Sequence, residues 1–323
     1  MPDAVCVPDP DLGERLCAAV PGVEVVVWDG HEEPPDGLDR VSVVVPPYPS
    51  ASWTAAQFAR LPAVAVLQVL SAGYEVWLPI APPGVTICNG RGVHGSSTAE
   101  LAVTGLLMHW HAMPALADQQ RAQRWEPVQA ETAWGRRVVV VGAGDIGSTV
   151  AAALQLFGAR TTLCGRTARD GVAPVTDLAE LCAGADALVL AVPLDDSTRG
   201  LVDAALLARL ADGAVVVNVA RGPVVDTAAL LAELQSGRLR AVLDVTDPEP
   251  LPAGHPLWSA PGLVLTPHVG GGAVGWRDRA GQLVADQARR WLEGRQLDNV
   301  VRPGTATTPG TPTPGTPTRR GAR

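Results

Sequence analysis

The sequence contains no lysine, so all 25 residues in its combined Lys and Arg count are arginines. Without a lysine amine the protein cannot form a Schiff base, and it lacks the lysine that a P-loop places on phosphates. The Tyr/Lys pair of short-chain dehydrogenases is excluded for the same reason, as are dehydrogenases that depend on a catalytic lysine. These absences remove several classes of enzyme before any motif is considered.

Long apolar runs are also missing, because the longest ones are of strand length and well short of a membrane span. The N-terminus lacks a basic region followed by an apolar stretch, so we expect no signal peptide. The five cysteines are scattered without a C-x-x-C pattern, which fits reduced thiols better than disulfides or a zinc site. The net charge of −8 argues against nucleic acid as the main partner. We therefore expect a cytoplasmic protein that binds neither membranes nor nucleic acid.

What is present indicates a globular α/β protein. The 323 residues suit two domains, and 47 % of them are hydrophobic. Short apolar runs alternate with helix-like segments, which predicts parallel sheets covered by helices on both faces. The predicted strands are 4–8, 23–28, 41–45, 64–70, 85–88, 138–141, 160–164, 187–192, 214–219, 241–245 and 263–266. The predicted helices outside the central passage are 12–20, 53–60, 148–157 and 277–292.

A long helical passage separates the two groups of strands. Ser97-Thr98-Ala99-Glu100 has the pattern of a capping box and predicts a helix that runs to about Met113. Pro114 breaks or kinks it, and a second helix continues to about Arg124. This passage suits a crossover between domains, and its Trp and Leu content also suits a dimer contact. At the other end of the chain, the composition of 303–323 predicts a disordered tail.

The most informative stretch is 138–147, where four valines run directly into the pattern G-x-G-x-x-G. A buried strand, a glycine turn and a helix N-terminus form the opening unit of a dinucleotide-binding domain. Gly142 allows the tight turn, Gly144 lets the backbone approach a pyrophosphate, and Gly147 lets the helix pack close to the strand. The N–H groups and positive dipole end of that helix then face the phosphates. The alternative is a glycine turn in an ordinary α/β protein.

Three charged side chains follow three successive predicted strands of the later group. Arg221 offers a fixed fork of donors that can hold a carboxylate, and His268 can exchange a proton near neutral pH. Glu249 can hydrogen-bond the second ring nitrogen of the histidine and favour the charged imidazole. Singly, each residue is compatible with a surface charge or a turn. At the carboxyl ends of neighbouring strands, together they suit the reduction of a carbonyl beside a carboxylate.

These motifs resemble those of the D-2-hydroxyacid dehydrogenases of the phosphoglycerate, hydroxypyruvate and glyoxylate type. The resemblance covers about residues 40–300 and rests on the strings 140–147, 192–194, 198–201, 218–222, 243–245, 249–252 and 266–271. It implies an α/β fold of two Rossmann-like or flavodoxin-like doubly wound parallel-sheet domains with a cleft between them. A substrate-binding domain would comprise 1–93 and 272–302. An NAD(P)-binding domain with the dimerisation helices would span 94–271, and the protein would be a homodimer.

The resemblance also implies a role for each residue of the site. Arg221 would orient and polarise the 2-oxo acid, His268 would protonate the carbonyl oxygen as hydride arrives, and Glu249 would assist His268. Asp244 would hold the nicotinamide carboxamide. The predicted cofactor-binding residues are Gly142, Gly144, Asp145, Ile146, Gly147, Arg166, Thr167, Val192, Pro193, Val219, Ala220, Arg221, Asp244, His268 and Gly270. The predicted substrate-binding residues are Ala72, Gly73, His94, Arg221 and His268, with backbone N–H groups at the first two.

The chain departs from the family pattern at the end of the second strand of the nucleotide domain. NAD-using members have Asp there, whereas this chain has Gly165, followed by Arg166 and then Arg169. An acidic residue would repel a 2′-phosphate, but a glycine with two arginines can accept one. We therefore expect NADP(H) in preference to NAD(H), which stays possible. The alternative is that Arg166 only stacks on adenine.

Two further departures bear on the substrate. His94 stands where many members have Asn, and its ring can contact substrate or nicotinamide. No regulatory domain follows residue 300, and no basic cluster near the loop at Ala72 suits a phosphate. We therefore expect glyoxylate or hydroxypyruvate as the 2-oxo acid, with phosphoglycerate as an alternative.

Two other functions remain open. The chain can be a dinucleotide-sensing protein like the corepressors that resemble this family, although its acidic charge and the lack of a peptide-docking signature argue against this. It can also be a formate-type or phosphite-type dehydrogenase, although Glu249 in place of Gln argues against formate. The expected function is an NAD(P)-dependent oxidoreductase that interconverts a small 2-oxo acid and its D-2-hydroxy acid.

Overall fold

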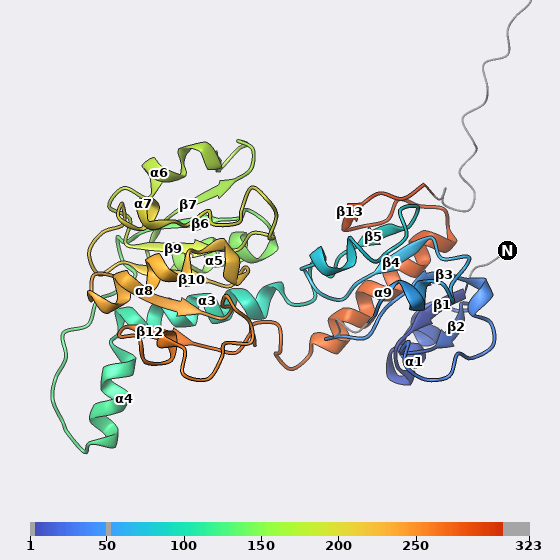
Figure 1. The fold of residues 1–323 in the computed structure, drawn as a ribbon, viewed down its shortest axis with the longest axis horizontal. Coiled ribbons are helices and arrows are strands. Elements are labelled where there is room, and N and C mark those ends of the chain that lie inside the picture. The colour runs from blue at the N-terminus through green and yellow to red at the C-terminus, as the bar shows by residue number, and fades with distance from the viewer. Residues whose placement is uncertain (1–3, 50–52, 306–323) are drawn as a thin grey trace, which may run out of the picture. The chain divides into compact units, whose positions relative to one another are not determined.

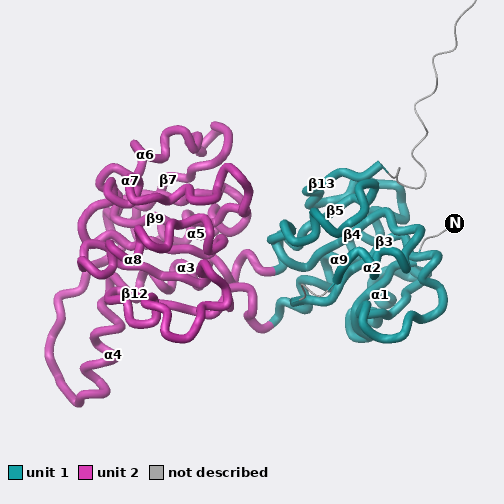
Figure 2. Tube along the Cα trace, viewed as in Figure 1, with its two compact units in different colours: residues 1–93, 275–323 teal, residues 94–274 magenta. Residues whose placement is uncertain are grey.

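The structure, a computed structural model, describes residues 4–49 and 53–305. The chain forms two compact units, one of residues up to Val93 and from Gly275 onward, the other of His94–Val274 (Figure 2). Each unit contains one sheet with helices on its faces. The predicted α/β architecture with two parallel-sheet domains is therefore confirmed.

The first unit has the strand order β13-β5-β4-β3-β1-β2 (Figure 1). Its strands are β1 (Ala4–Val7), β2 (Glu24–Val27), β3 (Val41–Val44), β4 (Val66–Gln68), β5 (Thr86–Cys88) and β13 (Val300–Arg302). The first five are parallel in the doubly wound order of flavodoxin-like sheets, and β13 pairs antiparallel with β5. The helices are α1 (Pro10–Ala19), α2 (Ala55–Phe58) and α9 (Trp276–Leu292).

Both faces of this first sheet are buried. Alternate residues of β1 point to opposite faces, so Val5 and Val7 pack with α1 and α9, whereas Ala4 and Cys6 pack with the tryptophans of the other face. A polar contact also ties α9 to the sheet, because the Gln287 amide donates to the buried Gln68 side chain at 2.8 Å. The C-terminal helix is thus an integral part of the first unit.

The second unit has the order β12-β11-β10-β9-β6-β7-β8, and all its strands are parallel. They are β6 (Arg137–Val141), β7 (Arg160–Gly165), β8 (Val172–Pro174), β9 (Ala187–Leu190), β10 (Val215–Asn218), β11 (Arg240–Leu243) and β12 (Leu263–Leu265). Its helices are α3 (Gly95–Trp110), α4 (Met113–Arg121), α5 (Asp145–Leu156), α6 (Leu178–Leu181), α7 (Ala204–Leu207) and α8 (Thr227–Gln235). This is the Rossmann order, with β6 as the first strand and one strand added after the sixth.

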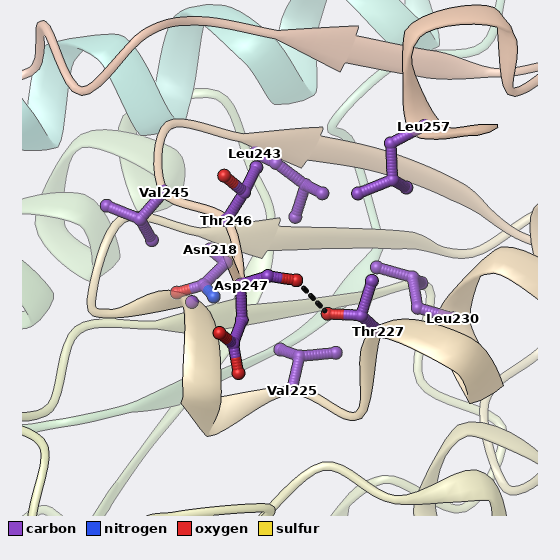
Figure 3. A pocket seen from close by; sticks show the side chains of 10 residues that line it. Asn218, Val225, Thr227, Leu230, Leu243, Val245, Thr246, Asp247 and Leu257 are labelled. Atoms are coloured by element: carbon purple, nitrogen blue, oxygen red, sulfur yellow. Dashed lines mark hydrogen bonds between the residues drawn. The ribbon is translucent and has the colours of Figure 1, made fainter. Parts of the chain in front are cut away.

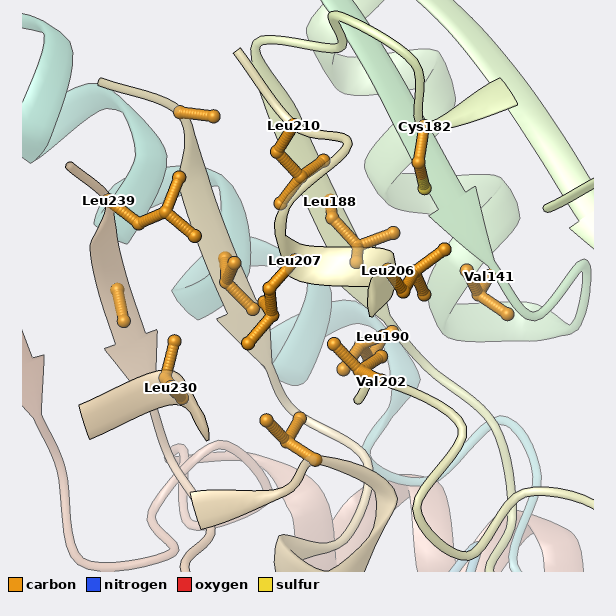
Figure 4. Close-up of a cluster of buried hydrophobic side chains, with 14 of the residues drawn as sticks. Val141, Cys182, Leu188, Leu190, Val202, Leu206, Leu207, Leu210, Leu230 and Leu239 are labelled. Carbon is orange, nitrogen blue, oxygen red and sulfur yellow. The ribbon is translucent and has the colours of Figure 1, made fainter. Parts of the chain in front are cut away.

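Two apolar layers bury the faces of the second sheet. Leucines of α7 and α8 pack with Leu188, Leu190 and Val141 on one face, as Figure 4 shows. On the other face, α3 and α5 pack against Val138 and Val140. The alternation along β6 therefore explains why four consecutive valines occur there: two face each layer.

The predicted capping box at residues 97–100 is wrong. Helix α3 begins at Gly95, one turn closer to the preceding strand, and His94 is its N-cap. The hydroxyls of Ser97 and Thr98 both donate to the carbonyl of His94, each at 3.0 Å, and so lie inside the helix. The pattern was misleading because such hydroxyls can either cap a helix or bond back to the preceding turn.

Other boundaries also differ from the prediction. Helix α5 begins at Asp145 and not at Ser148, directly after the glycine turn. The predicted division of the helical passage near Pro114 is confirmed, but α3 already ends at Trp110 and Pro114 lies in the first turn of α4, where a proline costs no helical hydrogen bond. The predicted tail is partly ordered, since the N–H groups of Gly304 and Thr305 donate to Thr86 and Gly84 beside β5. Its remainder, 306–323, lies outside the described residues.

Candidate active site

The glycine turn after β6 lets helix α5 begin directly against the strand. Gly142 has a φ of +109°, and a Cβ at this position would collide with the carbonyl of Ala191. A Cβ at Gly147 would collide with the carbonyl of Gly142. Gly144 is the N-cap of α5, no side chain caps the helix there, and a Cβ on Gly144 would meet no atom within 4 Å. The space in front of this helix N-terminus is therefore open.

This arrangement fits the pyrophosphate of a nicotinamide dinucleotide. Backbone N–H groups and the dipole at a helix N-terminus attract phosphate anions. The turn lies where the strand order reverses, with β9 on one side of β6 and β7 on the other, and such a reversal is where ligands of open α/β sheets bind. Val192 and Pro193 follow β9 at the same edge, and a Cβ at Gly142 would lie 3.2 Å from Cγ1 of Val192.

Two arginines lie beside this turn. Strand β7 ends at Gly165, and the guanidinium of the next residue, Arg166, lies 2.6 Å from Oδ2 of Asp195. The guanidinium of Arg169 donates to the carbonyl of Ala143 in the middle of the turn, at 2.8 Å. Both positive charges are thus placed next to the space in front of α5.

A buried carboxylate organises the opposite side of the site. Asp244 follows β11 and is only 3 % exposed. Its Oδ1 accepts from the Thr266 hydroxyl at 2.7 Å and the Val269 N–H at 2.9 Å, while Oδ2 accepts from the Gly270 N–H at 2.9 Å. The N–H of His268 donates to the carbonyl of Asp244 at 2.8 Å. One residue therefore fixes the whole segment from Thr266 to Gly270.

That segment places His268 against Glu249. His268 has a φ of +53°, and its Nδ1 lies 2.6 Å from Oε1 of the glutamate. A carboxylate only accepts hydrogen bonds, so Nδ1 carries the proton and Nε2 is the nitrogen left for exchange with another molecule. The two side chains are 48 % and 40 % exposed, so they are reachable from solvent. The pair has the arrangement of an acid–base histidine held by a carboxylate.

Arg221 lies in the loop after β10, the strand next to β11. Buried Asn218 holds this loop, because its side chain accepts from the Ala220 N–H at 3.0 Å and donates to the Arg221 carbonyl at 2.9 Å. The Arg221 guanidinium donates to the carbonyl of Ala220 at 2.6 Å. A Cβ on Gly222 would collide with the backbone of Thr246, so the loops after β10 and β11 lie in direct contact.

A small pocket between these two loops has a structural role. Figure 3 shows its lining, including the Thr227 hydroxyl that donates to the carbonyl of Asp247 at 3.3 Å. Its volume is about 10 Å³, which is room for about one water molecule. A larger cavity of about 460 Å³ opens beside the acid–base pair and is lined by Asp244, Glu249, His268, Leu251, Trp258 and Leu265 among others. Of these two cavities, the second is large enough for a small organic molecule.

The structure places the other predicted residues as follows. Val219 and Ala220 are buried between β10 and Arg221. Ile146 lies in the first turn of α5, and Thr167 is exposed after β7. His94 is only 5 % exposed and its Nδ1 lies 2.7 Å from the Gly271 carbonyl, which joins the start of α3 to the end of the His268 segment.

The loop at Ala72 and Gly73 belongs to the first unit, after β4. The Asn89 amide donates to the Ala72 carbonyl at 2.9 Å, and the Ser71 hydroxyl donates to the Gly73 carbonyl at 2.5 Å. The bond to the Ala72 carbonyl fixes the peptide plane that carries the Gly73 N–H. The plane that carries the Ala72 N–H is fixed by the Ser71 carbonyl, which accepts from the Gly90 N–H at 2.7 Å. These two N–H groups are the predicted ligands of the substrate carboxylate.

Sequence reasoning missed three residues that hold the site. Thr266 and Asn218 orient the groups described above, and Asp195 pairs with Arg166. Asn218 and Thr266 are polar residues at or directly after the end of a strand, and that signal could have found them. Asp195 lies five residues beyond β9, so the same signal does not reach it.

Several alternatives receive no support from the described residues, 4–49 and 53–305. They contain no group of three or more His, Cys, Asp or Glu arranged to hold a metal ion. They also contain no helix that is long and apolar enough to span a membrane. All five cysteines are free, and burial raises the pKa of Cys6, Cys88 and Cys182 to about 12. These three thiols therefore stay protonated at neutral pH and are poor nucleophiles.

Fold and site together define a dinucleotide-dependent oxidoreductase of the Rossmann type. The sequence profile of the "D-isomer specific 2-hydroxyacid dehydrogenase, NAD binding domain" matches residues 103–270. Among solved structures, the chain is similar to a D-isomer specific 2-hydroxyacid dehydrogenase from Xanthobacter autotrophicus, which was solved in complex with NADPH and MES. The two structures superpose with a TM-score of 0.79 and share 32 % sequence identity, and the match covers 93 % of this chain and 98 % of that one.

Named enzymes of two kinds are similar in sequence. The glyoxylate reductase/hydroxypyruvate reductase of Mus musculus is 30 % identical over 251 residues, which cover 73 % of this chain and 76 % of that enzyme. The D-3-phosphoglycerate dehydrogenase of Mycobacterium tuberculosis is 34 % identical over 230 residues, 68 % of this chain, and the match spans only 43 % of that longer enzyme. The chain belongs to the D-isomer specific 2-hydroxyacid dehydrogenases. It is an NAD(P)-dependent dehydrogenase of that family, as the motifs predict.

The glycine turn gives a prediction with a matched pair of variants. Gly147→Ala inserts a Cβ into the Gly142 carbonyl, and we expect it to destabilise the protein by about 2 kcal/mol or more. Gly144→Ala adds the same methyl group where it meets no protein atom, so the thermal midpoint should stay within about 2 °C. The methyl group then stands where the phosphates bind, and the dissociation constant of NADPH should rise at least about tenfold.

Thermal melts and fluorescence titration of NADPH measure these two effects separately. An equal loss of stability in both variants, or unchanged NADPH binding by Gly144→Ala, would contradict the assignment of the turn.

Proposed function

We propose that the protein reduces a small 2-oxo acid of the glyoxylate or hydroxypyruvate kind to its D-2-hydroxy acid, with His268 as the acid and base. The observation that carries the proposal is the hydrogen bond between His268 and Glu249. The loops after β11 and β12 hold these two residues, and the loop of Arg221 follows β10, the strand next to β11. The mouse relative named above, a glyoxylate/hydroxypyruvate reductase, supports the choice of substrate. Phosphoglycerate is the alternative substrate.

The chain's own groups perform the following steps in this proposal. A bound nicotinamide dinucleotide supplies or accepts the hydride. The guanidinium of Arg221 binds the 2-oxo acid through parallel N–H bonds and polarises its carbonyl. His268 gives the proton on Nε2 to the carbonyl oxygen as negative charge develops there, and takes it back in the reverse direction.

Two further groups prepare the site for these steps. Glu249 holds the imidazole ring through Nδ1. Asp244 keeps His268 in place through the segment around it and, by the same proposal, accepts a hydrogen bond from the nicotinamide carboxamide. The N–H groups of Ala72 and Gly73 bind the substrate carboxylate, and His94 contacts substrate or nicotinamide.

NADP(H) is the cofactor that we propose, with NAD(H) as a weaker alternative. Gly165 leaves the end of β7 without the carboxylate that would repel a 2′-phosphate, and Arg166 offers a positive charge there. The relative from Xanthobacter autotrophicus was solved with NADPH, which supports this choice.

The catalytic proposal predicts saturable oxidation of NADPH by the purified protein with glyoxylate or hydroxypyruvate. Replacing His268 by Ala removes the proton donor and should lower kcat about 100-fold or more. Replacing Arg221 by Ala removes the guanidinium that binds and polarises the substrate, so kcat/KM should also fall about 100-fold or more. Initial rates of cofactor oxidation, followed by absorbance with NADPH and with NADH, measure both effects.

Arg160→Ala is the matched control, because this exposed arginine lies at the opposite end of β7 and should leave the rates within about twofold. Unchanged turnover in Arg221→Ala would contradict the proposal. Tight NADPH binding without turnover of any 2-oxo acid, phosphohydroxypyruvate included, would instead favour the dinucleotide-sensing alternative.

We also propose that the protein is a cytoplasmic homodimer and that α4 lies in the dimer contact. Figure 1 shows α4 and the chain after it standing away from the sheet of the second unit, and no residue of α4 is buried. Trp125 is 97 % exposed, and with Leu116 and Val128 it lines a cavity of about 670 Å³. An exposed apolar surface of this kind, shared by a helix without buried residues and the chain after it, is typical of a subunit contact.

Sedimentation velocity tests the dimer. The wild type should have twice the 33.5 kDa mass of the chain, and Trp125→Arg should shift it toward the monomer. Leu156→Arg changes another apolar residue, 87 % exposed on α5, and should leave the mass unchanged. A monomeric wild type, or a dimer insensitive to Trp125→Arg, would contradict this part of the proposal.

A further inference from the structure

The ion pair between Arg166 and Asp195 joins two strands that are not neighbours. Arg166 follows β7 and Asp195 lies five residues beyond the end of β9, with β6 between the two strands. Strands in a sheet lie about 4.8 Å apart, so β7 and β9 are separated by about 10 Å. The ion pair therefore crosses the end of β6, where the glycine turn begins. It lies at the edge of the same space that the dinucleotide would occupy.

Asp195 cannot withdraw easily from this position. Its Oδ1 accepts from the N–H of Ser197 at 2.9 Å and from the hydroxyl of that residue at 2.5 Å, which leaves Oδ2 directed at Arg166. The Thr198 hydroxyl, which itself bonds to the Pro193 carbonyl at 2.8 Å, accepts from the Asp195 N–H at 2.8 Å. The carboxylate is thus built into the turn after β9, whereas Arg166 is a long side chain that is 73 % exposed.

The carboxylate is also charged under working conditions. Hydrogen bonds from Ser197, with smaller contributions from Arg166 and Thr198, lower the pKa of Asp195 below its ordinary value. A fixed negative charge therefore lies 2.6 Å from the arginine that we assign to the 2′-phosphate.

We propose that Asp195 sets the choice between the two dinucleotides: it competes with a 2′-phosphate for Arg166 and accepts the hydroxyl of an unphosphorylated ribose. The proposal rests on the dinucleotide cofactor of the proposed function and deepens it. In the free protein Arg166 is bonded to Asp195, and a 2′-phosphate must share or take over that guanidinium beside a like charge. A ribose hydroxyl instead donates to the same carboxylate, which thereby replaces the acidic residue missing at Gly165.

The carboxylate partner of Arg166 thus takes part in the choice of cofactor. Arg166 alone favours NADPH, and Asp195 reduces that preference so that NADH stays usable. The protein then uses both cofactors, with a preference that depends on one ion pair.

Binding titrations without a 2-oxo acid test the proposal directly. Asp195→Asn keeps an oxygen for the Ser197 bonds but removes the charge, so NADPH should bind about tenfold more tightly and NADH several-fold more weakly. Arg166→Gln should shift the ratio of the two dissociation constants in the opposite direction. Asp196→Asn is the matched control, because it removes an exposed carboxylate one residue away and should leave the ratio within about twofold. Calorimetry or nicotinamide fluorescence gives the dissociation constants.

Two results would overturn the inference. One is an unchanged ratio in Asp195→Asn. The other is weaker NADPH binding in that variant, as in Arg166→Gln, which would mean that Asp195 positions the arginine and does not compete for it. Because the titrations contain no 2-oxo acid, they test Asp195 even in a protein that binds dinucleotides without turnover. Dinucleotide binding without turnover would contradict the proposed function. The role of Asp195 would still be decided by the ratio of the NADPH and NADH dissociation constants.

Discussion

Asp244 accepts three hydrogen bonds with a side chain that is 3 % exposed, and the segment carrying His268 is built around them. Burying a carboxylate is costly unless its oxygens are bonded, so the three donors must stay in place whenever the unit is folded. The need to satisfy this charge fixes Thr266, Val269 and Gly270. It also holds His268 in a left-handed conformation, which is uncommon for residues other than glycine. The orientation of the His268 ring thus follows from the hydrogen bonds that a buried acid requires.

Sheet topology brings the other groups to the same edge. Strands β10, β11 and β12 are neighbours, and their following loops carry Arg221, Glu249 and His268. Strand β6 lies at the reversal of strand order and carries the glycine turn. The proposed dinucleotide site in front of α5 and the proposed proton donor after β12 therefore lie at the same edge of one parallel sheet. The chemistry depends on which side chains stand at those strand ends.

Much of this arrangement could be predicted from the sequence, since it depends on residue types with few alternatives. Only glycine fits at Gly142 and Gly147, where a Cβ would meet a backbone carbonyl. The valine runs of the central strands predict burial on both faces. The pairing of Glu249 with His268 could be predicted from the chemistry of the two groups, because a carboxylate accepts hydrogen bonds and a histidine ring N–H donates them.

Other features depend on three-dimensional neighbours and could not be predicted. Strands β8 and β13 are three residues long and exist because they pair with an edge that is already formed. The sequence places the start of α3 one turn too late, because the hydroxyls of Ser97 and Thr98 bond to a carbonyl inside the helix. The contact of Arg166 with Asp195 joins loops after strands separated by a third, which no local pattern indicates.

The central claim is that Glu249 and His268 act as one acid–base unit held by the Asp244 segment. A double-mutant cycle on kcat/KM tests it most directly, with Glu249→Gln, His268→Gln and the double variant compared with the wild type. If the glutamate acts only through the histidine, the double variant should be about as slow as His268→Gln alone. If the loss of kcat/KM in the double variant instead equals the product of the losses in the two single variants, the two residues act independently, and the account is contradicted.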